Sequence, residues 1–583
     1  MTLIAGAFAI SPSQRPLDAG ACAALRELLS RHPGEQVLEH RDHRACLLKV
    51  DIGAFAAPAF DVRPDGSAAM LSGDPLLARI PRPRNRTSDL AVLRDGWARG
   101  QWDIANRATG IFSAVYYDRD LATLHLIADP LGMRPIYYAL VNDTLFFAST
   151  LRVLAGLPGL TKSMDVRAVT EIAALGYPLG TRTPFAEIQL LGPAEVVHVS
   201  PQGLSRQRYR SWDDAAISTA PVEQLLEETY AAFSDACARR LGPDRTVAAN
   251  LTGGMDSRSV VAELWRRGLT IHTLNGSASG EQDQVFAAEF AQHAGTLHQE
   301  IPGAARESHF LTKLGDAWRR SPARQALPPE HPDIMWAGSG GSLVFGHIYQ
   351  TAEVANHLRA GRVREAIHCY QQAHGIAVPR KILRRGVRPR LAAAVETGIA
   401  EELRQFNCAD PARAFYLFLL FNDQRRHWGE VFEDIDRSRL EFHTPFYDAD
   451  FVATVMRCPL DLCLGHDFYT RWLACLPAIY MSVPWQTYPG HALCPLPVRQ
   501  GLQYQWDPAY VRQRGALRET DLREVSELLR DAEEFPAPLL SRSAIRMASW
   551  VSWSGLRDYG YLIRSARIYQ SYWKACAGAY VLP

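Results

Sequence analysis

The sequence predicts an α/β protein in two parts, a β-rich N-terminal part and a parallel-sheet part that ends in helices. Residues 1 to about 210 hold short apolar runs, such as 111–117, 124–128 and 144–148, separated by turn residues. From Val222 a helical period takes over, and strands then alternate with helices up to about residue 293. That alternation predicts a parallel sheet with its ligand at the carboxyl ends of the strands. Beyond about residue 350 the pattern is mostly helical.

Length and composition set the broad class. A chain of 583 residues is too long for one ordinary core, so we expect two domains, 1–212 and 222–583, joined by a linker around 211–221. The 47% hydrophobic and 21% charged content is typical of a globular protein. A net charge of +1 argues against a broad nucleic-acid or membrane-surface footprint. Since no apolar run approaches ~20 residues, no membrane span is expected.

The termini and the cysteines indicate a cytoplasmic protein. Residues 1–10 lack a basic region and are typical of a buried strand instead of a signal peptide. The ten cysteines form no Cys-x-x-Cys pair, which indicates neither a zinc site nor a disulfide framework.

Only five lysines occur, and none lies between 382 and 573, so no lysine in that stretch can take a catalytic role.

The most informative segment is 247–260, where an apolar strand runs into a glycine loop and then a helix. The two glycines, Gly253 and Gly254, let backbone N–H groups turn inward around an anion, and the helix N-terminus adds partial positive charge. Thr252 and Ser257 supply hydroxyl groups, and the Asp256 carboxylate is suited to hold Mg²⁺ against phosphate oxygens. This pattern predicts a pyrophosphate-binding loop that is not of the Walker type.

The loop resembles the Ser-Gly-Gly-x-Asp-Ser loop of ATP pyrophosphatases, which adenylate a carboxylate or carbonyl oxygen. The resemblance implies that ATP and Mg²⁺ are the cofactors of this chain and that the C-terminal part has the HUP-like ATP-pyrophosphatase fold. A plain Gly-Gly turn before a helix is the alternative interpretation. The ATP-binding residues that the resemblance implies are Leu251, Thr252, Gly253, Gly254, Asp256, Ser257, Leu274, Asn275, Gly338 and Ser339.

The N-terminal part resembles the glutaminase domain of asparagine synthetases, through 129–138, 147–149 and 181–185. The resemblance implies an Ntn-hydrolase-like αββα sandwich. In that family a cysteine after the initiator methionine cleaves glutamine, whereas here the position holds Thr2, a weaker nucleophile. Ser72-Gly73-Asp74 stands for the family's glutamine-binding Asn-Gly-Glu, and Thr109 replaces an expected acidic residue. We therefore expect a degenerate glutaminase domain that makes no ammonia.

A second glycine loop, 337–346, resembles the family's Ser-Gly-x-Gly-x-Asp-Glu segment, but the aspartate that would provide a second Mg²⁺ ligand is Ser342. The expected metal site is therefore Asp256 with Ser342, or with Asp333 or Asp283 as a substitute. For Asp283 a favourable charge at a helix N-terminus is an equally good interpretation.

Residues 441–448 resemble the family's Glu-x-Arg-x-Pro-Phe-Leu-Asp segment. Glu441 then takes the place of the active-site glutamate that orients or deprotonates an incoming amine. We expect Asp448 to cap a helix over 449–456. The family's phosphate-balancing lysine is missing. The charge could come from Arg471, from His491, from His443 or from the Arg425-Arg426-His427 cluster. With Glu441 and Asp256, Arg471 and His491 complete the predicted catalytic set.

A framework of this kind without its cysteine needs nitrogen from elsewhere, and two families resemble it: β-lactam synthetases and lasso peptide cyclases. The run 484–495, Pro-Trp-Gln-Thr-Tyr-Pro-Gly-His-x-x-Cys-Pro, is similar to the tail of proteobacterial lasso cyclases. That resemblance implies adenylation of an internal Asp or Glu side chain of a leaderless precursor peptide. The N-terminal amine of the peptide then closes a macrolactam. The implied partners are the precursor peptide, a leader peptidase and a leader-binding protein, without nucleic acid.

Three alternatives remain open at this point. An ammonia- or glutamine-dependent asparagine synthetase and a β-lactam-type or other small-molecule amide synthetase would share the ATP loop. A non-catalytic ATP-binding scaffold would explain Ser342 and the missing lysine. The sequence names neither the peptide nor its ring size.

Overall fold

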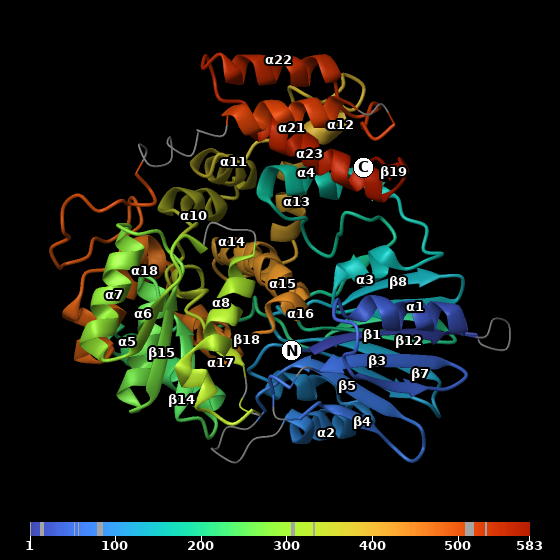
Figure 1. Cartoon of the computed structure of the whole chain (residues 1–583), viewed down its shortest axis with the longest axis horizontal. Coiled ribbons are helices and arrows are strands. Elements are labelled where there is room, and N and C mark those ends of the chain that lie inside the picture. Colours follow the sequence, from blue (N-terminus) through green and yellow to red (C-terminus); the bar gives the residue numbers. More distant parts are fainter. Residues whose placement is uncertain are drawn as a thin grey trace. The chain divides into compact units, whose positions relative to one another are not determined.

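The computed structural model of the chain forms two compact units (Figure 1). It describes residues 2–11, 17–51, 53–55, 57–77, 86–304, 309–329, 331, 333–507, 518–530 and 533–583. Unit 1 comprises residues 1–157, 191–351 and 428–506, and unit 2 comprises residues 158–190, 352–427 and 507–583. The predicted linker 211–221 lies inside unit 1, between a strand and a long helix. The division into domains 1–212 and 222–583 therefore stays a prediction.

The N-terminal part of unit 1 is a sandwich of two antiparallel sheets. In one sheet the neighbouring strands run β8-β9-β1-β3-β2, and in the other they run β13-β12-β7-β6-β5-β4. Apolar side chains that alternate along these strands, among them Ile4, Phe8, Leu47, Val115 and Leu126, fill the space between the sheets. Helices α1 and α3 pack on the first sheet and α2 on the second. This is the expected αββα architecture. The strands are β1 (Thr2–Ala9), β2 (Val37–Arg41), β3 (Ala45–Asp51), β4 (Phe60–Val62), β5 (Ala68–Gly73), β6 (Phe112–Asp118), β7 (Thr123–Ala128), β8 (Tyr137–Val141), β9 (Thr144–Ala148), β12 (Glu195–Ser200) and β13 (Gly203–Arg208), and the helices are α1 (Ala19–Leu29), α2 (Arg86–Trp97) and α3 (Leu151–Gly156).

The other half of unit 1 is built on a parallel sheet with the order β16-β15-β14-β17-β18. The chain builds outward from β14 to β16 and then returns to place β17 on the other side of β14. A crevice therefore opens between the carboxyl ends of β14 and β17, the switch point at which parallel sheets bind ligands. The elements are α5 (Val222–Leu241), β14 (Thr246–Asn250), α6 (Met255–Arg266), β15 (Thr270–Asn275), α7 (Gln282–Ala294), β16 (Leu297–Glu300), α8 (Phe310–Arg320), β17 (Ile334–Trp336) and β18 (Glu441–His443).

Short helices complete this half. The predicted helix at 449–456 is α17 (Ala449–Arg457), and Asp448 caps it by accepting bonds from the N–H groups of Asp450 (3.1 Å) and Phe451 (3.3 Å). Asp448 also forms ion pairs with Arg239 at 2.6 Å and Arg240 at 2.7 Å, which fixes α17 on α5. The remaining helices include α15 (Arg425–Glu433), α16 (Ile435–Ser438), α18 (Leu460–Cys463) and α19 (Asp467–Trp472).

Unit 2 is mostly helical, as predicted for the region beyond residue 350. Helix α23 packs on α4, where Thr170 Oγ1 lies 2.6 Å from the Tyr569 hydroxyl, and α21 and α22 pack beside α23. No helix in the described part of the chain is long and apolar enough to cross a bilayer. The elements are β10 (Met164–Asp165), α4 (Val166–Leu175), α10 (Ala352–Arg359), α11 (Val363–Ala373), α12 (Arg388–Ala392), α13 (Ala394–Leu403), α14 (Arg413–Phe418), α21 (Arg518–Arg530), α22 (Arg542–Trp553), α23 (Gly560–Ala575) and β19 (Tyr580–Val581).

Candidate functional site

The loop between β14 and α6 lies at the switch point, and its side chains hold its own backbone in place. The backbone N–H of Thr252 donates to Ser257 Oγ at 3.0 Å, and the N–H of Gly254 donates to Thr252 Oγ1 at 3.2 Å. The two hydroxyl oxygens lie 3.1 Å apart. The loop is thus preorganised before any anion binds, and the first turn of α6 points its N–H groups toward the crevice.

Glycines are required where the two glycine loops meet other backbone. A Cβ on Gly253 would lie 2.7 Å from the carbonyl oxygen of Gln282, at the start of α7. A Cβ on Gly338 would lie 2.2 Å from the N of Ser257. The loop after β17 therefore packs directly on the first turn of α6.

Asp256 is half-buried in the first turn of α6 and accepts three hydrogen bonds. Ser342 donates its N–H to Oδ2 and its hydroxyl to Oδ1, both at 2.8 Å, and the Tyr469 hydroxyl donates to Oδ1 at 2.9 Å. Burial raises the pKa of Asp256, while the bonds from Ser342 and Tyr469 lower it. Because the Ser342 hydroxyl donates to the carboxylate, Ser342 positions Asp256 in this structure. The role of Ser342 as a metal ligand stays a prediction.

A cavity of about 120 Å³ opens beside this carboxylate. One wall is the loop after β14 with the start of α6, and the facing wall comes from residues 486–488 and 505–506. Asp283, at the start of α7, also lines the cavity. Burial and the neighbouring Glu281 raise the pKa of Asp283 to about 6, against the N–H of Gly253, which lowers it. Two half-buried carboxylates, Asp256 and Asp283, therefore face one small space at the end of the parallel sheet. The lining residues are Thr252, Gly254, Met255, Asp256, Asp283, Ser342, Gln486, Thr487, Tyr488, Gln505 and Trp506.

The segment 483–506, which we call the wall segment, is held against the loop between β14 and α6 by backbone hydrogen bonds. The N–H of Gln486 donates to the Gly253 carbonyl at 3.0 Å, and the N–H of Gln503 donates to the Gly280 carbonyl at 3.1 Å. Arg258, fully buried on α6, donates to the carbonyls of Val483 and Pro484, the latter at 2.9 Å. The run 484–495 that the sequence singled out thus forms part of the wall of the cavity.

The other predicted nucleotide residues lie near the cavity but do not line it. The N–H of Leu251 is bonded to the Leu274 carbonyl at 2.9 Å, and the Asn275 side chain donates to the Leu251 carbonyl at 2.8 Å. These three residues are buried. Gly338 is buried against α6, whereas Ser339 is exposed.

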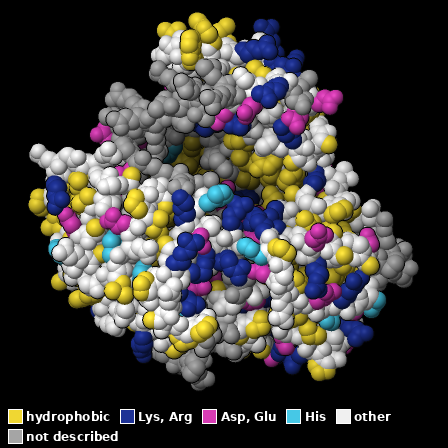
Figure 2. Space-filling model, viewed as in Figure 1, with side chains coloured by type: hydrophobic (Ala, Val, Ile, Leu, Met, Phe, Trp, Pro, Cys, Tyr) yellow, Lys and Arg dark blue, Asp and Glu magenta, His cyan; other side chains and the backbone are white. Residues whose placement is uncertain are grey.

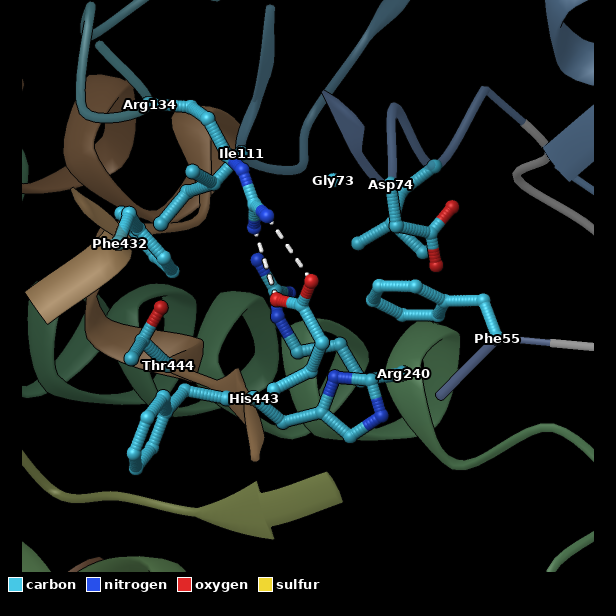
Figure 3. A pocket seen from close by; sticks show the side chains of 12 residues that line it. Phe55, Gly73, Asp74, Ile111, Arg134, Arg240, Phe432, His443 and Thr444 are labelled. Carbon is cyan, nitrogen blue, oxygen red and sulfur yellow. Dashed lines mark hydrogen bonds and ion pairs between the residues drawn. The ribbon is translucent and has the colours of Figure 1, made fainter. Parts of the chain in front are cut away.

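Glu441 lies in a different place from the one its predicted role requires. Glu441 is only 1% exposed. Its carboxylate accepts hydrogen bonds from both terminal nitrogens of Arg134, at 2.8 and 2.9 Å (Figure 3). Burial alone would raise the pKa of Glu441. The pKa is nevertheless lowered, because Arg134 carries the opposite charge. The surrounding space, lined also by Asp74, Phe432 and His443, measures about 20 Å³, enough for roughly one water molecule. Glu441 thus lines this second pocket and not the cavity beside Asp256, and its catalytic role stays a prediction.

Thr2, which stands where the resemblance places a nucleophilic cysteine, is surrounded by buried charged side chains. Thr2 is buried, and its hydroxyl oxygen accepts a bond from Arg86 at 3.0 Å and lies 3.4 Å from Asp51 Oδ2. Arg86 is itself paired with Asp51, and Lys49 lies 3.6 Å from the same carboxylate. Burial lowers the pKa of Lys49 well below its ordinary value. A buried guanidinium, that of Arg86, thus lies against the Thr2 hydroxyl.

The candidates for the missing lysine lie outside the cavity. Arg471 is 43% exposed and forms an ion pair with Glu223 at 3.2 Å, and His443 lines the pocket around Glu441. The His491 ring contacts the His466 ring at a tilt of 51°, with 4.4 Å between ring centroids, and its Nδ1 lies 3.1 Å from the Pro489 carbonyl oxygen. Arg426, within unit 2, donates to the carbonyls of Gly180 and Arg182, both at 2.7 Å. Neither Arg471 nor His491 lines the cavity, and their catalytic roles stay predictions. Asp333 is likewise held elsewhere, by Arg324 at 2.7 Å.

Several residues of the site could not have been selected from the sequence. Tyr469 contacts Asp256 across 213 positions of the chain, and Arg134 contacts Glu441 across 307. Gln505 and Trp506 reach the cavity through the return of the wall segment. Of the wall segment, Gln486, Thr487 and Tyr488 lay inside a run that the sequence had marked.

The comparisons with known proteins agree with this organisation. Residues 81–210 match the family described as glutamine amidotransferase domain, and residues 228–310 match the family described as asparagine synthase. The chain is 29% identical over 182 residues to asparagine synthetase [glutamine-hydrolyzing] 3 of Bacillus subtilis, a match that covers 30% of this chain and 29% of that protein. It is 25% identical over 255 residues to the asparagine synthetase of Asparagus officinalis, covering 41% of this chain and 37% of that protein.

A solved structure of glutamine phosphoribosylpyrophosphate amidotransferase from B. subtilis covers 53% of this chain and 92% of its own, at 10% identity and a TM-score of 0.25. At that score the superposition carries no argument. The matched region spans less than a third of the first B. subtilis relative. The chain therefore combines a glutamine-amidotransferase-like domain with an asparagine-synthase-like domain, the arrangement of the asparagine synthetase superfamily.

Proposed function

We propose that this protein is an ATP-dependent, AMP-forming amide ligase that acts on a peptide carboxylate and closes a macrolactam ring. The observation that carries the nucleotide part of the proposal is the preorganised loop after β14, which meets a cavity lined by Asp256 and Asp283. The similarity to asparagine synthetases supports the reaction class. The peptide part rests on the run 484–495 and on the state of the N-terminal half.

The donor set fits a magnesium nucleotide. Oxygen ligands are what Mg²⁺ prefers, and Asp256, Asp283 and Thr252 line the cavity, with the Ser257 hydroxyl 3.1 Å from that of Thr252. Mg²⁺ held there would offset phosphate charge. The N–H groups at the start of α6 bind the phosphates, and Ser342 and Tyr469 keep the Asp256 carboxylate in one orientation.

The proposed reaction has two steps. A substrate carboxylate oxygen attacks the α-phosphorus of ATP, and pyrophosphate leaves. The amine nitrogen then attacks the acyl carbon, loses a proton to water, and AMP leaves. The protein's contribution is to hold the two reacting groups together, which replaces a bimolecular encounter by an intramolecular one. Glu441 has no part in this scheme, because Arg134 holds both of its oxygens.

The N-terminal half supports an amine source other than glutamine. Thr2 stands in place of the nucleophilic cysteine, and Arg86 donates to its hydroxyl oxygen. A hydroxyl whose lone pair accepts a guanidinium proton is a poor nucleophile toward an unactivated amide. We infer that this half is catalytically inactive and that the amine belongs to the substrate. A peptide with a freed N-terminus meets that requirement, with a leader peptidase and a leader-binding protein as the partners that the proposal implies.

The substrate class is tested by supplying two nitrogen sources to the same protein. Purified full-length protein with Mg²⁺ and ATP is incubated either with aspartate and ammonia or with a leaderless candidate peptide from the neighbouring genes, and products are weighed by mass spectrometry. The proposal predicts a peptide that has lost one water, and no such product with Asp256→Ala. Asparagine formation from the first mixture alone would instead establish an ammonia-dependent asparagine synthetase.

A further inference from the structure

Unit 2 carries an exposed surface that the proposed function does not use. It consists of the outer side of α22 with the turn after it, and of the segment 380–390, and we call it the α22 surface. Backbone bonds join the two parts: the N–H of Ser541, the N-cap of α22, donates to the Ile382 carbonyl at 2.8 Å, and the N–H of Arg384 donates to the Leu539 carbonyl at 2.8 Å. In Figure 2, hydrophobic and basic side chains lie next to one another over α22, at the top of the view.

Large apolar side chains are exposed on the α22 part. Met547 is 61% exposed, Trp550 56%, Trp553 57% and Leu556 75%. Met547, Trp550 and Trp553 follow one another at intervals of three, so that they lie along one side of the helix. Since a side chain of this size presents roughly 200 Å², the four together leave on the order of 500 Å² of apolar surface in water. A patch of this size on one part of a molecule indicates a binding surface.

The neighbouring segment is strongly basic. It carries six exposed cations within eleven residues, and no acidic residue occurs between Glu365 and Glu396. Among the residues that the structure describes, no carboxylate lies within ion-pair distance of any of the six. Lys381 donates instead to the Tyr559 hydroxyl at 2.6 Å, and Arg388 to the Leu383 carbonyl at 2.9 Å. The six are Arg380, Lys381, Arg384, Arg385, Arg388 and Arg390.

Further cations lie around the apolar side chains themselves. Arg546 and Arg557 are exposed at the two ends of the row, and Arg564 follows on α23. The exposed acid of this region, Asp558, accepts the N–H of Gly560 at 2.8 Å near the start of α23. The whole surface therefore has a positive charge, and the groups that it would attract are anionic.

We propose that the α22 surface docks the protein on an anionic lipid bilayer. Helices that lie in the membrane interface combine large apolar side chains, such as tryptophan and leucine, with arginine or lysine. Their aromatic rings lie at the level of the headgroups. Stable attachment of this kind needs two signals, an apolar insertion and a polybasic patch, and both are present here. The apolar area is below the roughly 800 Å² per partner of a standard protein–protein interface, which favours shallow insertion over a second copy of the chain.

The test is co-sedimentation of the full-length protein with vesicles of phosphatidylcholine alone or of phosphatidylcholine with phosphatidylglycerol. We expect binding only to the anionic vesicles, and weaker binding as salt is raised. Trp550→Ser with Trp553→Ser should lower the affinity at least tenfold. The matched control is Trp265→Ser, because that tryptophan is 41% exposed on α6 in unit 1.

The basic part is tested separately. Arg384→Gln with Arg385→Gln should lower the affinity for anionic vesicles about tenfold or more and flatten its salt dependence. Arg99→Gln with Arg320→Gln, two exposed arginines of unit 1, should not. The proposal is overturned if wild type fails to sediment with anionic vesicles at low salt, or if the control variants lose as much binding as the test variants. Binding to a short duplex RNA without binding to vesicles would also overturn it and assign the surface to nucleic acid.

Discussion

Replacing Arg134 by methionine should lower the free energy of unfolding by more than the loss of an exposed ion pair would. The substitution leaves the Glu441 carboxylate, 1% exposed, without the two charged donors at 2.8 and 2.9 Å that now satisfy it. Arg134 also donates to Ser72 Oγ at 2.7 Å and to the Thr2 carbonyl at 3.1 Å. Removing one partner of a buried ion pair typically costs about 3–5 kcal/mol, because the other charge stays buried and unpaired.

The effect should largely disappear in the double variant. Glu441→Gln removes the charge, so Arg134→Met costs much less in its presence, and the two changes should be non-additive by about 2 kcal/mol or more. Urea denaturation of the four proteins at pH 7, followed by tryptophan fluorescence, measures this coupling. The matched control is the Arg364–Glu396 pair, whose side chains are 83% and 33% exposed and whose coupling should stay below about 0.5 kcal/mol.

The coupling should also depend on pH in a defined direction. The pKa of Glu441 is lowered in the folded protein, against the effect of burial, by the charge of Arg134. The stabilisation is therefore complete above the unfolded pKa of about 4.3 and is lost as pH falls through the lower folded value. Additive effects at pH 7, or a coupling no larger than that of the exposed control pair, would refute the reasoning about this ion pair.

Three further outcomes follow from the surroundings of the cavity. Burial lowers the pKa of His466 to about 3, so stability should fall as pH is lowered from 6.5, by about 2 kcal/mol at pH 5, and His466→Gln should remove that part of the pH dependence in urea titrations. Gly338→Ala should abolish ATP-induced thermal stabilisation because its Cβ meets the α6 backbone, whereas Gly386→Ala, with open space around it, should not. Ser342→Ala should lower the stability of the nucleotide-free protein by about 1–2 kcal/mol, since one donor to Asp256 is lost, and unchanged stability would contradict the assigned role.

Local patterns predicted the elements of the fold that carry the nucleotide loop. The apolar run at 247–251, the two glycines and the helical period after them correspond to β14, the loop and α6, because each is determined by residues close in sequence. The same holds for Asp448, whose cap depends on N–H groups two and three residues away. The side-chain partners of the site were not accessible in this way. The position of Glu441 in a motif could not show that Arg134, on the other half of unit 1, takes both of its oxygens.

Two sequence arguments could not take the three-dimensional arrangement into account. Arg471 had the right charge and the right place in the order of motifs, but it lies on the side of α19 that faces Glu223 and solvent. The net charge of +1 argued against a membrane-surface footprint, yet it is an average over the whole chain. It conceals the segment 380–390, where six cations occur together without an acid, and only the structure shows that backbone bonds join this segment to the start of α22.

The central claim, that the loop after β14 serves an adenylating site, is tested most directly by the identity of the nucleotide product. The full-length protein is incubated with Mg²⁺, α-labelled ATP and the candidate peptide, and the labelled products are separated. The account predicts AMP with an equal amount of pyrophosphate, and neither with Asp256→Asn. Labelled ADP as the product, or AMP formation that survives Asp256→Asn, would contradict it.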